Sequence, residues 1–315
     1  MSEQTLDAAA DASAPAVDAQ AWREVLWSLP QPILVLGSMT LVALAITTEW
    51  MNADLFTTIM IVLPLPLVLV AERIWKKRED WTLEPGEFLE DAGWLAAGAF
   101  VWVPIYSDYY ETPISRGFEF IRDQSALSVA MQPESTLGLL GCAVLVLVLS
   151  EFIYYWLHRV QHESFFWWRI HATHHHITKM SAARGDRTHP LEWATLMLSR
   201  PIVLALLGAS GDVVAVVTAF GFWQGYLNHS NLPLRTNRLF ALVFSTAQMH
   251  HLHHALDMDS SNKNYGCSII VWDRLFGTFS DRDIEGPLGA GTGAPLSVPT
   301  QLALAFYPSE KLKSL

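Results

Sequence analysis

Residues 137–162 read LGLLGCAVLVLVLSEFIYYWLHRVQH, and this stretch decides the fold. Its first part, 137–157, is an almost uninterrupted apolar run, longer than the about 17 residues that a membrane-spanning helix needs at minimum. The run ends in HRVQH, where His158 and His162 lie at positions i and i+4 and therefore on one face of a helix. A membrane helix that ends in a pair of imidazoles predicts a metal site at one face of the membrane.

Five further apolar runs surround this stretch along the chain. They cover residues 32–48, 55–71, 92–106, 193–208 and 212–227. Trp50 and Trp75 follow the first two runs, where indole rings favour the membrane interface. The last two runs are separated by the short turn 209–211, as in a helical hairpin. We therefore expect an all-α integral membrane protein, a helical bundle with four to six spans.

The composition of the 315-residue chain agrees with burial in lipid. Hydrophobic residues make up 51% and charged residues only 16%, whereas soluble domains carry about 25% charged residues. The formal net charge of -11 argues against a nucleic-acid partner, which needs a basic face. Cys142 and Cys267 are too few for a disulfide framework or a thiolate metal cluster.

The distribution of basic residues predicts an orientation. If the N-terminus is cytoplasmic, all of the 20 Lys and Arg residues except Arg116, Arg122 and Arg200 fall in segments on the inside. Cytoplasmic loops carry the excess of basic residues in membrane proteins. We therefore expect the N-terminus, all the histidine clusters and the C-terminus on the cytoplasmic side.

All 12 histidines lie between His158 and His254, mostly in three clusters. After HRVQH come HATHHH (171–176) and HHLHH (250–254), and both contain the pattern H-x-x-H-H. Two triplets and one pair supply eight nitrogens, and His229 and His189 raise the number to ten. One ion cannot hold so many ligands, so the sequence predicts two metal ions in a histidine-rich helical cap.

Imidazole ligands alone leave the metal and the reaction open. Neutral imidazole suits iron, zinc, copper and nickel alike. HRVQH lacks the glutamate of the H-E-x-x-H protease helix, which counts against a membrane zinc protease. A di-zinc membrane hydrolase that acts on a lipid ester is the first alternative to an oxygen-dependent enzyme. A metal transporter is a weaker one, because transport sites lie near the bilayer midplane and these clusters follow the spans.

The order of motifs resembles the fatty acid hydroxylase superfamily, also called the sterol desaturase family, over about residues 137–280. The resemblance rests on H-x-x-x-H, two H-x-x-H-H motifs, HPLE (189–192), HSN (229–231), NYG (264–266) and WDRLFGT (272–278). It implies a membrane-bound oxidoreductase, a monooxygenase (hydroxylase) or desaturase of lipid metabolism, with two non-haem iron ions and O2 as co-substrate. It further implies a lipid substrate and a separate electron donor, such as a ferredoxin, cytochrome b5 or a reductase. The iron ligands that it implies are His158, His162, His171, His174, His175, His250, His253 and His254, joined by His229.

One departure from the family bears on the ligand count. Some fatty acid hydroxylases have H-x-x-x-H where this chain reads GYLNH (225–229), so one expected histidine is absent. His189, Asn228 or a water is a candidate to replace it. His189 has an alternative role as the cap of the helix that begins beside Pro190.

Several polar residues are candidates for orienting the ligands. Glu151 lies seven residues before His158, inside the span, and we expect it to accept a hydrogen bond from a ligand imidazole. Asn228 and Asp257 are further candidates near the predicted centre. The remaining acidic candidates are Asp186, Glu192 and Asp273, each of which can equally form a surface pair. His176 and His251 are expected to be surface or hydrogen-bonded residues, and Arg200 the partner of an acid or a lipid phosphate.

The sequence divides into four expected segments. Residues 1–25 form a disordered acidic tail, and residues 26–136 hold the first three spans. Residues 137–285 form the catalytic domain, which resembles the hydroxylase family. Residues 286–315 form a Gly- and Pro-rich tail.

Overall fold

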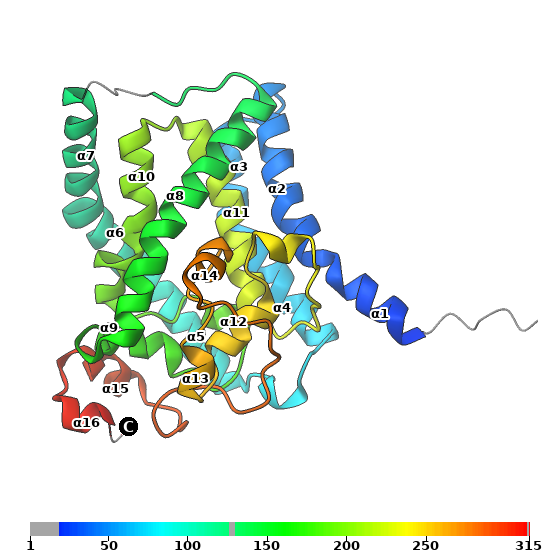
Figure 1. Ribbon diagram of the computed structural model, residues 1–315, viewed down its shortest axis with the longest axis vertical. Coiled ribbons are helices and arrows are strands. Elements are labelled where there is room, and N and C mark those ends of the chain that lie inside the picture. The colour runs from blue at the N-terminus through cyan, green and yellow to red at the C-terminus, as the bar shows by residue number, and fades with distance from the viewer. Residues whose placement is uncertain (1–18, 126–129, 314) are drawn as a thin grey trace, which may run out of the picture.

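The computed structural model describes residues 19–125, 130–313 and 315 of the chain. These residues form helices and no strand, apart from the isolated β-bridges Phe244–Ile269 and Ala255–Leu288. Long helices run side by side in the upper part of Figure 1, and most of the short helices and loops of the second half of the chain lie below them. The protein is an all-α membrane bundle with a helical layer at one end.

Five helical segments are long and apolar enough to cross a membrane. They are Gln20–Thr47, Ala53–Ile74, Pro85–Gln124, Thr136–Glu163 and Pro190–Leu207. The helices within them are α1 (Ala19–Ser28), α2 (Pro30–Thr47), α3 (Ala53–Val62), α4 (Pro64–Ile74), α5 (Pro85–Ala97), α6 (Val103–Tyr106), α7 (Thr112–Gln124), α8 (Thr136–Glu163) and α10 (Ser199–Leu207). Each of the first five predicted apolar runs falls in one of these segments.

The sixth predicted run is α11 (Gly211–His229), which stands in the middle of the bundle. It packs against α2, α3 and α8 along its length (Figure 1). Val216, Phe220 and Leu227 on this helix are fully buried. Because protein surrounds α11, its last turns can carry the polar side chains Gln224 and Asn228 without exposing them to lipid.

The third span is much longer than the run 92–106 suggested. It is one helical path of 40 residues from Pro85 to Gln124, with π-helical turns at Gly98–Trp102 and Ser107–Glu111. The turns precede Pro104 and Pro113, and a wider turn accommodates the ring and the missing N–H of a proline. These prolines and the charged residues of α7 interrupt the apolar pattern, so the sequence did not reveal that the helix continues beyond residue 106 to Gln124.

Apolar side chains cover much of the outer surface of the bundle. Phe100 and Leu137 are about four-fifths exposed, at 80% and 82%, and Val62 is 63% exposed. A soluble monomer rarely exposes so much contiguous apolar surface. The outer surface of the bundle is therefore suited to contact lipid, as the composition predicts.

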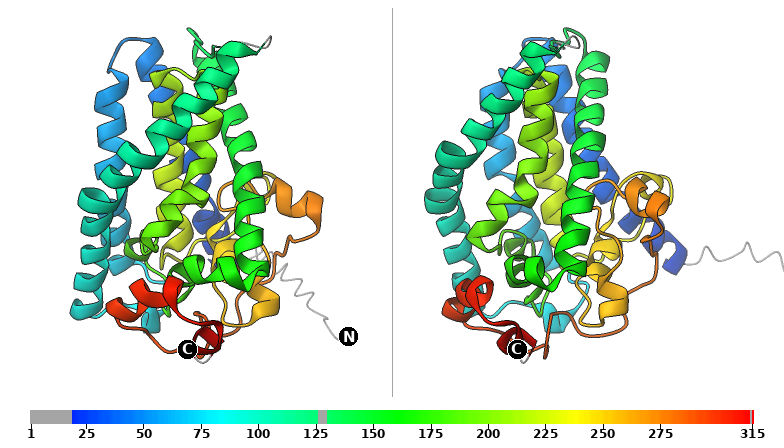
Figure 2. Two further views of the ribbon diagram at one scale, coloured as in Figure 1. Left: turned by 90° about the vertical axis from the view of Figure 1, so that its left-hand side faces the viewer. Right: turned by 60° about the vertical axis from the view of Figure 1, so that its left-hand side comes forward.

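The layer at the end of the bundle contains the short helices of the second half of the chain (Figure 2). They are α9 (Phe165–His175), α12 (Ala247–His253), α13 (Met258–Ser261), α14 (Val271–Phe276), α15 (Val298–Ala303) and α16 (Ser309–Lys313). The indole N–H of Trp272 in α14 donates to the carbonyl of Val148 in α8, at 3.1 Å. This contact ties the layer to the long helix from which the first histidines come.

The structure corrects the two predicted tails. Residues 1–18 lie outside the described residues, but 19–25 begin α1, where the Glu24 carboxylate pairs with Arg235 at 3.1 Å. At the other end a loop is expected over the Gly- and Pro-rich residues 286–299, and the loop ends at 297, where α15 begins. The residues after it cover α9, because Leu304, directly after α15, and Leu312 of α16 pack with Ala172 in a small apolar cluster. The C-terminal segment is therefore part of the helical layer.

Candidate metal centre

Nine buried histidines converge in two groups where the bundle meets the helical layer. The five-histidine group contains His158, His162, His171, His175 and His253. The four-histidine group contains His174, His229, His250 and His254. In each group one ring nitrogen per residue lies within 4.8 Å of all the others. The nine are the same histidines that the sequence singles out as candidate ligands, and they come from α8, α9, α11 and the α12 region.

Each H-x-x-H-H motif contributes to both groups. His171 and His175, at i and i+4, belong to the five-histidine group, whereas His174 belongs to the four-histidine group. In the second motif His250 and His254 form the i, i+4 pair of the four-histidine group, and His253 belongs to the other. Each motif thus supplies side chains to both groups. The groups are adjacent, because the rings of His175 and His254 stack with their centroids 4.5 Å apart.

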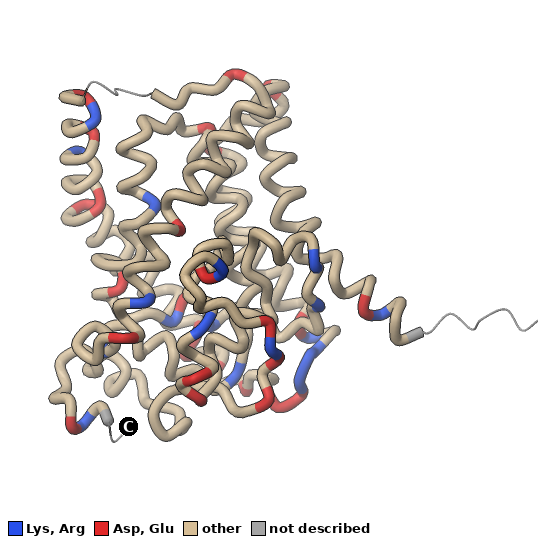
Figure 3. The backbone as a smooth tube through the Cα atoms, in the orientation of Figure 1, with Lys and Arg blue, Asp and Glu red and all other residues tan. Residues whose placement is uncertain are grey.

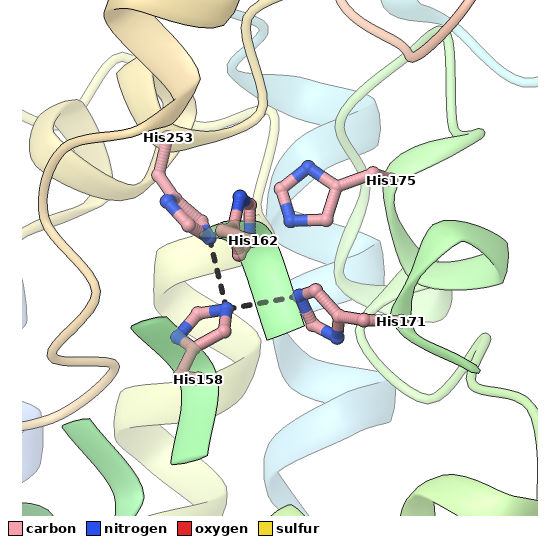
Figure 4. A group of neighbouring side chains, drawn as sticks. All are labelled: His158, His162, His171, His175 and His253. Carbon is pink, nitrogen blue, oxygen red and sulfur yellow. Dashed lines mark hydrogen bonds between the residues drawn. The ribbon is translucent and has the colours of Figure 1, made fainter. Parts of the chain in front are cut away.

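Within the five-histidine group, side chains from three separate segments point toward one another (Figure 4). The Nε2 atoms of His158 and His171 are 2.9 Å apart, and those of His158 and His253 are 3.2 Å apart. In the four-histidine group the Nε2 atoms of His229 and His250 are 2.9 Å apart. Nitrogens that share an ion at right angles, with metal–nitrogen bonds of about 2.1 Å, lie about 3.0 Å apart.

The protonation of these rings fits a cation between them. The Nδ1–H of His158 donates to the carbonyl of Tyr265 at 2.6 Å, and that of His253 donates to the carbonyl of Lys263 at 2.8 Å. A carbonyl only accepts, so in each neutral ring the Nε2 atom carries a lone pair. Two lone pairs that face each other at 3.2 Å repel, and a shared positive ion removes the repulsion.

The same pattern holds in the four-histidine group. The Nδ1 atom of His229 faces the carbonyl of Gly225 at 2.9 Å, and that of His174 faces the carbonyl of Arg187 at 3.3 Å. Their Nε2 atoms are 3.2 Å apart.

His175 of the five-histidine group is 1% exposed, and neither of its ring nitrogens has a hydrogen-bond partner within the described structure. Buried polar atoms without partners are costly, so these residues fit a pair of bound ions.

Burial keeps the histidines outside the spans neutral. Burial first, and neighbouring imidazoles second, hold the pKa of His174, His175, His250 and His254 well below the ordinary value. Burial, followed by the nearby His171, lowers the pKa of His253 to about 3. Metal ligation requires the neutral imidazole, so these side chains are in the correct state at neutral pH.

Glu192 is the carboxylate that faces a candidate ligand. Its Oε1 atom lies 3.4 Å from Nδ1 of His171, and both side chains are at least 98% buried, at 1% and 2% exposure. Neither carboxylate oxygen, nor Nδ1 of His171, has a hydrogen bond in the part of the chain that the structure describes, so the two groups are free to pair with each other. The HPLE motif therefore provides a carboxylate that can orient His171, in the manner usual for metal-binding histidines.

Glu151 does not take the expected role. Its Oε2 atom accepts the backbone N–H groups of Ser268 and Ile269, at 3.0 and 3.2 Å. The expectation failed because the loop that supplies these N–H groups follows α12 in the sequence and folds back onto α8. Glu151 therefore anchors this loop and does not orient an imidazole.

The two other orienting candidates also have different roles. The amide of Asn228 donates to the carbonyl of Cys267 at 2.8 Å and accepts from Gln31 at 2.8 Å, so it ties α11 to α2. Asp257 is exposed and caps α13, where it accepts the N–H of Ser260 at 3.1 Å. It lies outside the centre because its helix faces solvent.

Three histidines lie outside both groups. His189 caps the following 3-10 turn: its Nδ1 accepts the N–H of Leu191 at 3.1 Å and its Nε2 faces the carbonyl of Leu302 at 3.1 Å. Both nitrogens are thus in use, and the capping alternative applies. His251 is buried beside Lys77, with Nδ1 3.1 Å from Nζ. His176 is also buried, at 6% exposure, so neither it nor His251 is a surface residue.

Asp273 holds the turn that anchors the five-histidine group. Its carboxylate accepts the N–H groups of Tyr265 and Gly266, at 2.8 and 2.7 Å, and the hydroxyl of Thr278 at 2.6 Å. Burial raises its pKa, and these hydrogen bonds oppose the rise. The same turn presents the carbonyl of Tyr265 to His158, so Asp273 acts on the histidines through the backbone.

Sequence reasoning missed two buried carboxylates in the first half of the chain. Glu72 accepts the N–H groups of Ala182 and Asn231, each at 2.8 Å, and so joins α4 to the loops beside the histidines. Asp91 is fully buried and pairs with Arg184 at 3.1 Å and with Arg187. The available signal was an acidic residue directly after one apolar run, Glu72, and another directly before the next, Asp91.

A cavity of about 300 Å³ borders both groups. His171, His174 and His229 form part of its wall, and the rest comes from α8, α10, α11 and the loop 185–193. Cavities of this size lie at the lower end of the range for small-molecule sites. The arrangement can therefore hold part of a lipid beside two metal ions.

Comparison with known proteins identifies the central domain. Residues 143–278, less than half of the chain, match the family model for fatty acid hydroxylase. This part of the chain is a fatty acid hydroxylase domain. The chain is 29% identical to an ornithine lipid hydroxylase of Rhizobium tropici, over 79% of this chain and 75% of that protein. The domain and the names of the relatives are those of oxidoreductases of lipid metabolism, and the chain is an enzyme of this kind.

Other relatives match a smaller part of the chain. An alkylglycerol monooxygenase of Caenorhabditis elegans is 27% identical over 52% of this chain, and a very-long-chain aldehyde decarbonylase of Oryza sativa is 30% identical over 46%. The alignments cover only 32% and 24% of those proteins. No solved structure matches the chain.

Proposed function

We propose that this protein is an O2-dependent hydroxylase of a membrane lipid, with two iron ions in the two histidine groups. The observation that carries the proposal is the pair of groups with Nε2 atoms 2.9–3.2 Å apart beside a cavity. When bound, the irons would supply activation of O2 and removal of hydrogen from a C–H bond of the lipid. Two relatives named as a hydroxylase and a monooxygenase support oxygen insertion over desaturation.

The proposed ligands are the nine grouped histidines. His158, His162, His171, His175 and His253 would hold one ion. His174, His229, His250 and His254 would hold the other. His189 has no place in this set, because both of its nitrogens are engaged. Backbone carbonyls and Glu192 fix several rings at Nδ1, and this fixation directs Nε2 at the ions and lowers the cost of ordering them.

The protein also controls access. The proposed ligands lie at 0–8% exposure, so bulk water has little access to the ions that they would hold. The adjoining cavity opens beside them and would admit the lipid. The substrate would enter from the bilayer between the spans. We further propose that the histidine end faces the cytoplasm, because most of the Lys and Arg residues lie in the lower half of the molecule, where the helical layer is (Figure 3). A cytoplasmic electron carrier of the ferredoxin, cytochrome b5 or reductase type would then have access.

The test is lipid mass spectrometry combined with metal exchange. Lipids of cells that express the wild-type protein are compared with those of cells that express His175→Ala. The proposal expects a species that gains one oxygen, present only with the wild type and only in the presence of O2. A species that loses two hydrogens would indicate desaturation. Full activity under strict anaerobiosis, or activity restored by zinc alone, would favour the di-zinc hydrolase and overturn the proposal.

A further inference from the structure

The cavity beside the histidines carries charges that a hydrocarbon chain cannot satisfy. Arg200 lies on its wall in the first turn of α10, and Asp186 lies on its wall in the loop that precedes His189. Charged groups inside a membrane bundle are costly and are generally functional. The role of these two residues follows from their partners and from their positions along the cavity.

Arg200 has an incomplete set of partners. Its Nε atom is buried without a hydrogen bond, and no carboxylate of the described chain lies within the 4.0 Å of an ion pair. Glu151 interacts with Arg200 electrostatically, but its carboxylate already accepts two backbone N–H groups. The guanidinium lies against Gly221 of α11, where an added Cβ would be only 2.9 Å from Nη1. The absence of a side chain at Gly221 thus leaves room for the guanidinium.

Asp186 also has an incomplete set of partners, but here the unpaired atom is a hydrogen-bond acceptor. Its Oδ2 atom is buried and has no hydrogen-bond partner in the described structure, while the carboxylate interacts with the hydroxyl of Tyr226. Burial raises the pKa of Asp186 to about 6, so the group is still mostly ionised at neutral pH. The preceding Gly185 touches the four-histidine group, because a Cβ there would be 3.1 Å from Nδ1 of His229.

The two charges lie at different levels of one cavity. Gly221, beside Arg200, and His229, beside Gly185, are both on α11, and eight residues of helix span about 12 Å. A ligand in the cavity therefore meets a carboxylate next to the histidines and a guanidinium up to two turns farther into the bundle. An anionic group suits Arg200, which recognises carboxylate or phosphate oxygens. An ammonium or hydroxyl group suits the open oxygen of Asp186.

We infer that Arg200 and Asp186 bind the charged head group of the lipid, so that the oxidised carbon lies near this head group and not at the end of an acyl chain. The inference rests on the proposed function and adds the substrate class: an amphiphile with an anionic group and a hydrogen-bond donor several bonds apart. A pure hydrocarbon, a sterol or a neutral ether lipid would leave both charges unsatisfied.

The test uses probes that lose one charge at a time. The probes are N-palmitoyl-ornithine, its methyl ester and its δ-N-acetyl derivative, together with lysophosphatidylethanolamine as a phosphate-containing probe. Binding to the iron-loaded protein in detergent is measured by native mass spectrometry, and turnover is measured separately as the mass gain of one oxygen. The wild type is expected to bind the methyl ester and the acetyl derivative at least tenfold more weakly than the parent.

The variants assign each loss to one residue. Arg200→Gln is expected to weaken binding of the parent at least tenfold and to leave binding of the methyl ester unchanged. Asp186→Asn is expected to weaken binding of the parent at least tenfold and to leave binding of the acetyl derivative unchanged. Arg200→Lys should restore part of the discrimination, and Gly221→Ala, which displaces the guanidinium without removing its charge, should reduce it. Arg122→Gln is the matched control, because Arg122 bonds to the carbonyl of Ala205 away from this cavity and should have no effect.

The outcomes separate this inference from the proposed function. Discrimination in binding without oxygen insertion would retain the inference and contradict the hydroxylase proposal. Equal binding of parent and methyl ester by the wild type, or an equal loss for both in Arg200→Gln, would overturn the inference, because Arg200 would then be structural. Stronger binding of the phosphate probe would identify phosphate as the anion, and stronger binding of the ornithine probe would identify a carboxylate.

Discussion

The five-histidine group and the four-histidine group use the same motifs but are held in place differently. In the first, four of the five rings face an acceptor at Nδ1, and three of these acceptors come from the single turn 262–265. In the second, His174 and His229 face carbonyls, whereas Nδ1 of His250 and of His254 has no partner among the described residues. The comparison indicates one group fixed by a downstream turn and another that is less constrained.

The groups also differ in their position relative to the cavity. His174 and His229 of the four-histidine group line it, whereas only His171 of the other group does. The histidines beside the cavity would tolerate a change in ring position, whereas the histidines that the turn holds would keep their arrangement. Changes at the turn should therefore affect one ion alone, and the following variants test this difference.

The largest effect is expected from removing a ligand from either group. His158→Ala and His250→Ala should each reduce product formation at least a thousandfold, because the proposed chemistry needs both ions. Product is measured by lipid mass spectrometry with protein that remains monodisperse in detergent. His176→Gln is the control, since His176 belongs to neither group. Activity above one tenth of wild type in either alanine variant would contradict the assignment.

Asp273→Asn should come next. The amide would place an N–H group opposite the N–H of Gly266, which the carboxylate now accepts at 2.7 Å, and would leave a buried donor unsatisfied. We expect activity to fall about 10- to 100-fold, with metal lost from the five-histidine group only. Asp259→Asn, at an exposed position of α13, should be unaffected. Equal loss of metal from both groups would show that the turn does not act selectively.

Glu192→Gln should have a smaller effect. It removes the negative charge 3.4 Å from Nδ1 of His171 and retains the shape of the side chain. The expected decrease in kcat is about tenfold, at the lower end for partners of metal-binding histidines. The exposed Glu285→Gln is the control. An unchanged kcat would mean that the carboxylate does not orient this ligand.

Asn262→Ala should have the smallest effect. The side-chain oxygen of Asn262 faces Nδ1 of His162 at 3.2 Å, and the other four rings of the group keep their positions without it. We expect a two- to fivefold decrease, or about 0.4–1 kcal/mol, in the lower part of the range for one hydrogen bond. Kinetics with the wild type measured in parallel would detect it. A decrease in activity as large as that of Asp273→Asn would mean that activity depends on the position of His162 alone and not on the whole turn.

Much of the site was predictable from helical spacing. Histidines at i, i+3 and i+4 must emerge close together on a helix, and this local rule selects eight of the nine histidines that the structure brings together. The ninth, His229, is isolated in the sequence and was indicated by the family resemblance. The local rule cannot divide each triplet between two groups, because that division depends on how α9 and α12 pack against α8 and α11. His174 and His253 therefore belong to a different group from the i, i+4 pair of their own motif.

The residues that hold the ligands were harder to predict, because their contacts are long-range. Asp273 acts through a turn, and Glu151 binds a loop more than a hundred residues away in sequence, which no spacing rule connects to α8. The spans were visible as apolar runs. The length of the third span was not, because Pro104 and Pro113 resemble helix ends in the sequence.

The metal content of the purified protein is the most direct test of whether each histidine group holds one iron ion. The protein is purified without added metal, and iron and zinc per chain are measured for the wild type, His158→Ala and His250→Ala. The account predicts two irons per chain in the wild type and about one in each variant, with a different ion remaining in each. One metal per chain in the wild type, zinc in place of iron, or an unchanged metal content in both variants would contradict it.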